Sequence, residues 1–247
     1  MCPECQRPAA VGVQCVDCVR EAARQVGPTR TVLGGRAGAR RPHVTLTLIG
    51  ANVAIFLLGF FTPVVRELLI FWPAVGEVQP YRAITSGFLH GGMLHLLLNM
   101  YALWLIGPFL EQLLGRWRFV SLYFLSLFGG TVAVVLFASP ADISWRIGVV
   151  GASGAVFGLF GAVFLVLRHL GRDAQQIFVV IALNVVFSFV VRGISWQAHL
   201  GGLVVGALLA LIFTRLPRRL QSAGGVIGVV AVAAVLVVVY LGLYAVK

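Results

Sequence analysis

Five polar side chains lie within stretches of sequence that are otherwise apolar, and together they could perform acyl-transfer chemistry. They are His90, His95, Asn99, Ser153 and His199. A serine hydroxyl next to a neutral imidazole can attack a carbonyl carbon, because the imidazole accepts the hydroxyl proton. Polar side chains are costly in a lipid-like environment, so those that occur within apolar segments are candidates for function.

Taken singly, these residues have simpler interpretations. A serine in an apolar helix usually bonds to a carbonyl one turn earlier, and a single asparagine can join two helices. His199 alone could be a packing histidine, and His90 could cap a loop. Only their joint placement favours chemistry over packing.

Several other hydrolytic mechanisms are excluded by the sequence. No histidine begins an HExxH zinc motif, and Asp17, Asp142 and Asp173 lie outside the apolar runs. All cysteines fall within the first eighteen residues. The sequence around Ser153 reads GASGA, so it is not the GxSxG turn of sheet-based hydrolases. A Ser–His pair remains, without an acidic residue placed to complete a triad.

The composition places these residues in a polytopic membrane protein. Hydrophobic residues make up 60% of the 247 residues and charged residues 11%, and the mean hydropathy is +0.97. Soluble domains carry about 25% charged residues. The net charge of +11 does not indicate nucleic acid, because the basic residues cluster between the apolar runs. The lipid bilayer is therefore an expected partner.

Seven apolar runs approach or exceed the length that a helix needs to cross the hydrocarbon core. The predicted spans are 44–62, 89–110, 119–139, 147–167, 174–191, 196–214 and 224–246. We therefore expect an all-α polytopic membrane protein. Its parts are a Cys-rich segment at 1–25, a basic linker at 26–43 and a membrane domain at 44–247.

Positive charges predict the orientation of these spans. A cytoplasmic N-terminus places 14 of the 19 Lys and Arg residues on the inner side, as the excess of basic residues in cytoplasmic loops requires. The C-terminus is then extracytoplasmic, and the plasma membrane is the expected location. The second, fourth and sixth spans all run inward, so His95, Ser153 and His199 lie near the outer face. At about 1.5 Å per residue, we expect Ser153 about 9 Å below the entrance of its span.

Small residues predict that two of these spans pack closely. Gly154 and Gly158 in the fourth span are four residues apart, as are Gly202 and Gly206 in the sixth. This spacing puts both members of a pair on one helix face and lets two backbones approach. The sixth span can therefore press the face that carries His199 against the start of the fourth.

The segment 63–88 is far longer than the other loops and mixes apolar residues with charged ones. Such an amphipathic segment on the outer side is a candidate functional element that lies partly in the membrane interface. A plain connector with aromatic anchors at the interface explains the same residues equally well.

Two CxxC pairs lie at the N-terminus, formed by Cys2 with Cys5 and by Cys15 with Cys18. Four thiolates at this spacing suit a structural zinc ion, which we expect here. Disulfides rarely persist in the cytoplasm, so free or redox-active thiols are the alternative. Because Cys2 directly follows Met1, we expect the zinc module to begin further upstream.

Three motifs, in this order along the chain, resemble those of the rhomboid intramembrane serine proteases. They are HGGMLH…N at 90–99, GASG at 151–154 and AHLGG…G at 198–206. The resemblance covers roughly residues 80–214. It implies a rhomboid-like bundle of six core transmembrane helices plus one C-terminal helix. The Cys-rich segment also resembles the zinc-binding N-terminus of some actinobacterial members of the family.

The resemblance implies a role for each polar residue. Ser153 corresponds to the nucleophile and His199 to the general base, which together form a dyad. His95, Asn99 and the backbone N–H of the serine correspond to the oxyanion hole. Donors aimed at the developing oxyanion are strong in a low-dielectric site, which agrees with these roles.

Other motif residues are expected to support these groups. Gly151 and His90 belong to the same motifs. Phe157 lies four residues after the serine on one helix face, where it can stack against His199. Glu111 fits the family pattern at the inner end of the second span.

The implied function is that of a protease, a hydrolase that cleaves transmembrane segments of other membrane proteins near the extracytoplasmic face. It needs no cofactor for catalysis and no nucleic acid. An inactive relative that binds transmembrane helices as a chaperone or adaptor is the main alternative, and the intact Ser153, His199 and Asn99 speak against it. A small transporter with a polar path is a third, for which the specificity of the motifs leaves little room.

Overall fold

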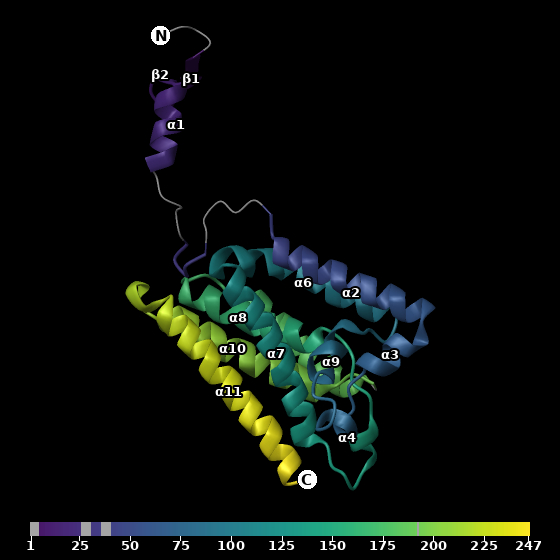
Figure 1. Ribbon diagram of the computed structural model, residues 1–247. Helices are drawn as coiled ribbons and strands as arrows, with labels where there is room; N and C mark the ends of the chain where they lie inside the picture. The colour runs from purple at the N-terminus through teal and green to yellow at the C-terminus, as the bar shows by residue number, and fades with distance from the viewer. Residues whose placement is uncertain (1–4, 26–30, 36–40, 192) are drawn as a thin grey trace.

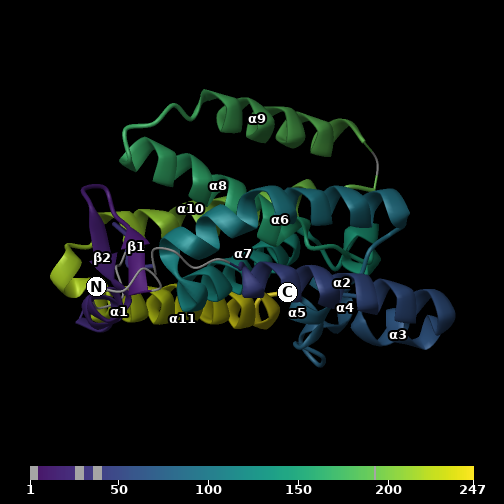
Figure 2. The same cartoon turned by 90° about the horizontal axis from the view of Figure 1, so that it is seen from above.

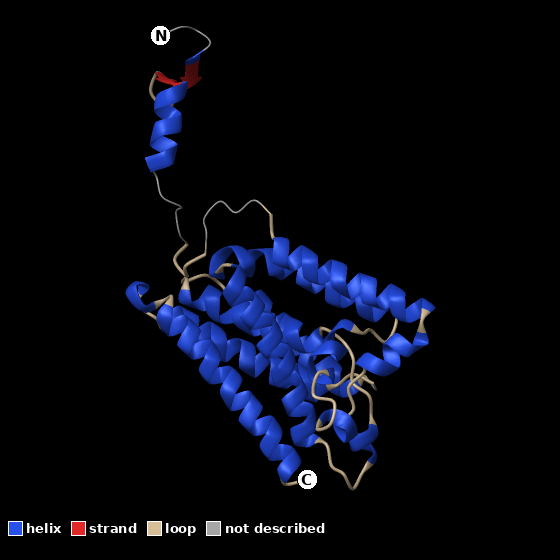
Figure 3. Ribbon diagram, viewed as in Figure 1, coloured by secondary structure: helices blue, strands red, loops and turns tan. Residues whose placement is uncertain are grey.

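The computed structural model describes residues 5–25, 31–35, 41–191 and 193–247, and helices dominate this part of the chain (Figure 3). Its long helices are α2 (His43–Phe61), α6 (Met93–Leu114), α7 (Arg116–Phe137), α8 (Ser153–His169), α9 (Gln175–Val190), α10 (Trp196–Arg215) and α11 (Ala223–Ala245). Shorter elements connect them: α3 (Pro63–Leu69), α4 (Pro73–Gly76), α5 (Arg82–Thr85), η2 (Ser86–Phe88), η3 (Ile143–Arg146) and η4 (Arg218–Leu220).

Each predicted span corresponds to one of these long helices, which confirms the all-α membrane fold. Among the described residues, five helices are long and apolar enough to cross a membrane, and α8 and α9 are shorter apolar helices. Several ends agree closely with the predictions. The first span, predicted at 44–62, is His43–Phe61, and the sixth, predicted at 196–214, is Trp196–Arg215.

The start of the fourth span differs from the prediction, because α8 begins at Ser153 and not at residue 147. The preceding chain is held in other contacts. Val149 N donates to Phe71 O at 2.8 Å, and Gly151 N donates to Ser86 O at 3.0 Å. The expectation that the serine lies six residues, or about 9 Å, along a helix is therefore wrong. It is the first residue of the helix.

The second span also begins later, at Met93 rather than at residue 89. Gly92 has an extended backbone and precedes the first helical residue. His90 therefore lies in the turn before α6, and its prediction as a residue inside the span is wrong. Its carbonyl accepts a hydrogen bond from Arg66 at 3.4 Å, which joins the turn to α3.

Helices α7, α8 and α10 form the centre of the bundle, and α9 lies outside it (Figure 2). The backbones of α8 and α10 approach closely. A Cβ atom on Gly202 would collide with Gly154 O, and one on Gly206 would collide with Gly158 O. The predicted close packing of these two glycine pairs is confirmed.

Helix α2 runs along α6 at one edge of the bundle (Figure 1). The buried carboxylate of Glu111 joins the two helices, because it accepts hydrogen bonds from Val44 N at 3.0 Å and from Thr45 N and Oγ1 at 2.8 Å each. The first N–H groups of a helix have no partner within it. Glu111 from α6 therefore caps the start of α2.

The segment between α2 and α6 is a packed element rather than a plain connector. Phe71 is only 1% exposed. Two tyrosines of α11 reach this segment, since Tyr240 donates to Gly76 O at 2.9 Å and Tyr244 donates to Pro73 O at 2.8 Å. The segment thus rests on α11 on one side and holds the chain that leads into α8 on the other.

The N-terminal part contains β1 (Gln6–Pro8), β2 (Val13–Cys15) and α1 (Val16–Gln25), which lie apart from the bundle in Figure 1. Residues 31–35 lie against the bundle itself. Thr31 Oγ1 donates to Leu113 O at 2.5 Å, and Leu33, which is 2% exposed, accepts a hydrogen bond from Arg118. These contacts attach part of the predicted linker to the ends of α6 and α7.

Candidate active site

Ser153 occupies the first position of α8, directly after the turn residue Ala152. The N–H groups of a first helical turn have no partner within the helix, and Ala152 before it supplies no side-chain cap. The helix dipole adds partial positive charge at this end. An oxygen that becomes negative beside Ser153 would meet both the free N–H groups and this positive end.

Gly151 creates the space in which His95 approaches the serine. A Cβ atom on Gly151 would lie 2.7 Å from His95 Cε1, 2.8 Å from His95 Nε2 and 3.7 Å from Ser153 Oγ. The backbone of Gly151 has a φ of +122°, which residues with a side chain rarely adopt. Both the conformation and the lack of a side chain are therefore needed here.

A hydrogen bond at Nδ1 determines which nitrogen of His95 carries the proton. Gly91 N donates to His95 Nδ1 at 3.2 Å. A neutral imidazole whose Nδ1 accepts must carry its hydrogen on Nε2. This Nε2 faces Gly151, so His95 can donate a hydrogen bond to an oxygen atom close to Ser153.

Asn99 lies one turn after His95 on α6 and is buried. Its Nδ2 donates to His95 O at 2.9 Å. A side-chain amide has two N–H donors, and this bond uses one of them. The second N–H is a group that can donate to a substrate oxygen.

His199, near the start of α10, is held between α8 and α9. The ring of Phe157 stacks on its imidazole, with 4.0 Å between ring centroids and 13° between planes. This is the stacking predicted from the position of Phe157 one turn after Ser153. On the other side, His199 Nδ1 forms a 2.6 Å hydrogen bond with Ser188 Oγ of α9.

No hydrogen bond joins Ser153 to His199 in the part of the chain that the structure describes. The two residues are related instead through Phe157, which follows one turn after the serine and stacks on the imidazole. Hydrogen bonds between catalytic groups are often long without substrate and tighten when it binds. The structure thus brings the predicted residues to one end of α8 but does not pair the serine with the imidazole.

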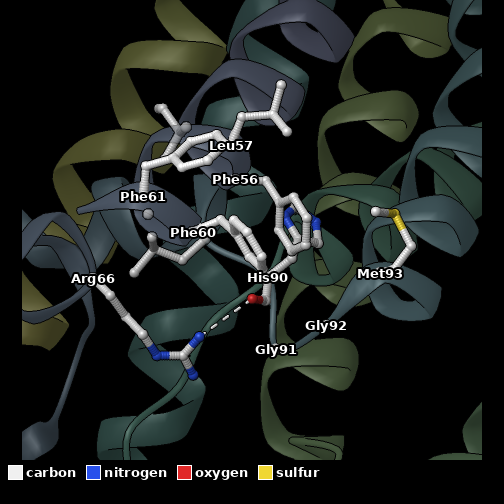
Figure 4. Close-up of a pocket in the computed structure, with 12 residues that line it drawn as sticks. Phe56, Leu57, Phe60, Phe61, Arg66, His90, Gly91, Gly92 and Met93 are labelled. Atoms are coloured by element: carbon white, nitrogen blue, oxygen red, sulfur yellow. Dashed lines mark hydrogen bonds between the residues drawn. The ribbon is translucent and has the colours of Figure 1, made fainter. Parts of the chain in front are cut away.

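A cleft of about 490 Å³ lies next to this site, between the end of α2 and the turn before α6. Figure 4 shows phenylalanine rings of α2 along it and the side chain of Arg66, which reaches the carbonyl of His90. The His90 ring lines the cleft and packs edge-on against His95, with 5.1 Å between centroids. Ser153 does not line this cleft.

The cysteines do not assemble a metal site among the described residues. Gln6 pairs with Cys15 in the hairpin, so Cys5 and Cys15 lie at the same end of it, and Cys18 follows in the first turn of α1. However, no group of three or more His, Cys, Asp or Glu side chains in the described ranges is arranged to hold a metal ion. Cys2 lies outside the described residues. The zinc ion stays a prediction.

Ser188 is a residue of this site that the sequence alone does not reveal. A serine in an apolar helix is usually explained by a bond to its own backbone, and Ser188 does make one, to Asn184 O at 2.6 Å. Its separation of eleven residues from His199 crosses a loop, so helix periodicity could not relate the two. Only the packing of α9 against α10 brings them together.

The fold and these residues define a polytopic membrane protein with a polar site inside a helical bundle. The chain belongs to the rhomboid family, because the family model described as the Rhomboid domain matches residues 77–216. This range contains the polar residues His90, His95, Asn99, Ser153, Ser188 and His199.

Similar proteins include several that are named rhomboid proteases. The putative rhomboid protease YdcA of Bacillus subtilis is 33% identical over 192 residues, which are 72% of this chain and 93% of that protein. Rhomboid protease AarA of Providencia stuartii is 27% identical over 233 residues, 80% of this chain and 82% of that protein. Rhomboid protease GluP of Bacillus subtilis is 34% identical over 144 residues, 55% of this chain and 26% of that protein.

Proposed function

We propose that this protein is an intramembrane serine endopeptidase that cleaves transmembrane segments of other membrane proteins. The names of its relatives and its membership of the family support a protease. The observation that carries the proposal is that residues from three helices lie together at the N-terminal end of α8. His95 Nε2 faces Ser153 across Gly151, and His199 stacks on Phe157 one turn further along.

In the proposed reaction, Ser153 Oγ attacks the carbonyl carbon of the scissile peptide bond. His199 Nε2 accepts the serine proton and then gives it to the departing amine. A water molecule hydrolyses the resulting acyl-enzyme, with the same imidazole as the base. The carbonyl oxygen becomes negative in each step, next to the N–H of Ser153, His95 Nε2 and the amide of Asn99. These donors are preorganised, which is the property that stabilises a transition state most effectively.

The position of the site along α7 supports cleavage near the extracytoplasmic face. A Cβ atom on Gly154, next to Ser153, would lie 3.7 Å from Gly130 Cα, in the second half of α7. Residues 31–35 contact Arg118 at the start of α7, whereas Lys247 Nζ donates to Val135 O, near the end of the same helix, at 2.6 Å. Residues 31–35, which precede the membrane domain, and the C-terminal residue therefore contact opposite ends of α7. Basic residues place the N-terminal end in the cytoplasm. The plasma membrane, with the C-terminus outside, is the location we infer.

Cleavage of a model transmembrane substrate by the purified, reconstituted protein tests the proposal. Ser153→Ala and His199→Ala should each reduce cleavage to the background rate. Ser121→Ala is the matched control, because Ser121 lies in α7 and bonds only to its own helix, at Trp117 O. Cleavage that persists in Ser153→Ala would contradict the mechanism. A wild-type protein that binds but never cleaves such substrates would favour an inactive adaptor.

The oxyanion role of Asn99 has its own test. Removal of one oxyanion donor costs about a hundredfold in kcat in other serine proteases. Asn99→Ala should therefore lower kcat by about a hundredfold while the protein still folds, as checked by its elution in size-exclusion chromatography. An unchanged kcat would remove Asn99 from the oxyanion hole.

The zinc ion predicted for the N-terminal cysteines is tested by metal analysis of the purified protein. We expect about one zinc ion per chain, because four thiolates make one tetrahedral site. Cys15→Ser together with Cys18→Ser should release it. Protein that contains no zinc after purification without chelators would contradict this prediction.

A further inference from the structure

Helix α9 buries a single residue, and that residue is polar. Every residue of α9 is described, and among them only Ser188 is buried, with 3% of its surface exposed. The apolar side chains of the helix are exposed or partly exposed, as expected where a helix faces lipid. An apolar residue would suit the one inward position of such a helix on packing grounds alone. The presence of a serine there calls for a partner.

Ser188 Oγ has two hydrogen-bond partners, and the direction of one bond determines the direction of the other. Its Oγ lies 2.6 Å from Asn184 O in its own helix and 2.6 Å from His199 Nδ1 in α10. A hydroxyl has one proton to donate, whereas its oxygen accepts through two lone pairs. A carbonyl oxygen can only accept. When the Ser188 proton goes to Asn184 O, Ser188 Oγ must accept the hydrogen that His199 carries on Nδ1.

We propose that Ser188 is a positioning residue that holds His199 in the tautomer needed for a general base. This inference rests on the proposed function of His199 and identifies what orients it. With its hydrogen on Nδ1, the imidazole presents an unprotonated Nε2, which accepts the proton of Ser153. The opposite tautomer would place a hydrogen on Nε2 and leave no base. Ser188 keeps its own proton on the bond to Asn184 throughout.

Phe157 and Ser188 restrict different motions of the same ring. Phe157 is stacked on the face of the imidazole and fixes its plane. Stacking leaves the ring free to flip within that plane, which would exchange Nδ1 with Cδ2. The hydrogen bond from Nδ1 to Ser188 Oγ prevents this flip. The two contacts together therefore specify both the plane and the direction of the ring.

Substitutions of Ser188 that differ only in the hydroxyl test the proposal. Threonine and valine have nearly the same shape, so Ser188→Thr keeps the acceptor and Ser188→Val removes it. A cavity of about 20 Å³ lies next to Ser188 and His199. It has room for about one water molecule, so water could replace the hydroxyl in Ser188→Ala. Valine fills this space and gives the cleaner comparison.

We expect kcat to fall when the hydroxyl at position 188 is removed and to be largely retained when the hydroxyl is kept. Outer partners that orient a functional histidine contribute about ten- to a hundredfold when removed, as measured at metal sites. Ser188→Val should lower kcat at least about tenfold with an unchanged KM, and Ser188→Thr should recover most of the loss. Cleavage by the wild-type protein and by Ser153→Ala, measured in the same assay, tests the proposed protease function independently of Ser188. Equal kcat values for Ser188→Val and Ser188→Thr would overturn the role of Ser188 while leaving the protease intact.

A spectroscopic measurement determines the tautomer of His199 without relying on an activity assay. Solid-state ¹⁵N spectra of histidine-labelled protein in bilayers distinguish protonated from unprotonated ring nitrogens, and the His199 signals are those that vanish in His199→Gln. We expect His199 to carry its hydrogen on Nδ1 in the wild type, and to show a mixture of tautomers in Ser188→Val. A hydrogen on Nε2 in the wild type, or identical spectra in the two proteins, would overturn the proposal.

Discussion

Helices α8 and α9 both lie beside α10, but they meet it in different ways. The contact of α8 with α10 is made by backbones, since Gly202 and Gly206 leave no room for a Cβ atom. The contact of α9 includes one buried side chain, Ser188, and a hydrogen bond to His199. One interface is therefore fixed by steric fit along its length, whereas the other depends on few contacts.

The interface of α8 with α10 and the interface of α9 with α10 therefore have different roles. Close packing of α8 against α10 sets the distance between the helix that carries Ser153 and the helix that carries His199. The bond from α9 sets the direction in which the imidazole points. Changes in the first interface should alter the fold, and changes in the second should alter kcat alone.

The largest effect is expected from a side chain at the glycine contact. Gly202→Val puts a branched side chain against Gly154 O, where no rotation can relieve the clash. Overpacking typically costs about 1–3 kcal/mol, and a clash with backbone lies at or above that range. We expect little folded protein after solubilisation and no cleavage. Gly242→Val in α11 is the control, because a Cβ there meets nothing within 4 Å. A normal yield of active Gly202→Val would contradict the steric account.

Truncation of one leucine in each helix compares the interior with the lipid-facing side. Leu159 in α8 is fully buried, whereas Leu183 in α9 is 64% exposed. Leu159→Ala should lower the free energy of unfolding by about 2–5 kcal/mol, because it leaves a cavity. Leu183→Ala should change it by less than about 0.5 kcal/mol. Thermal or denaturant unfolding in one detergent measures both, and equal losses would remove the distinction between the two helices.

The helical part of this molecule follows from its sequence, but the approach to Ser153 does not. Runs without charge predict α2 and α10 to within a residue or two. The same criterion places the start of α8 at residue 147, because Ile147 to Ala152 are as apolar as the helix after them. Backbone bonds from Val149 and Gly151 to a segment 65 or more residues earlier keep this stretch extended. The amino-acid composition of this stretch does not predict such long-range backbone pairing.

The candidate site, like the fold, is predicted only in part by the sequence. Ser153, His95 and His199 are found from residue type and motif, and the position of Phe157 follows from helix periodicity. Ser188 is not found, because its own helix explains it equally well. Its function depends on how α9 packs on α10, which the sequence of α9 alone does not determine.

A smaller effect, confined to activity, is expected at Gly151. Gly151→Ala introduces a Cβ atom that His95 must avoid, in a backbone conformation that alanine rarely adopts. A displacement of about 1 Å can cost about a hundredfold in rate. We therefore expect kcat to fall about a hundredfold with the protein still folded. Gly171→Ala is the control, since its φ is also positive, at +65°, and a Cβ there meets nothing within 4 Å. Equal activities of the two variants would contradict the role of Gly151.

The central claim is that Ser153 is a nucleophile made reactive by His199 across the interface of α8 with α10. Covalent labelling by a fluorophosphonate, followed by mass spectrometry of the digested protein, measures this directly. We predict one adduct, on the peptide that contains Ser153, and no adduct in His199→Ala. An adduct on another serine, or full labelling of Ser153 in His199→Ala, would contradict the account.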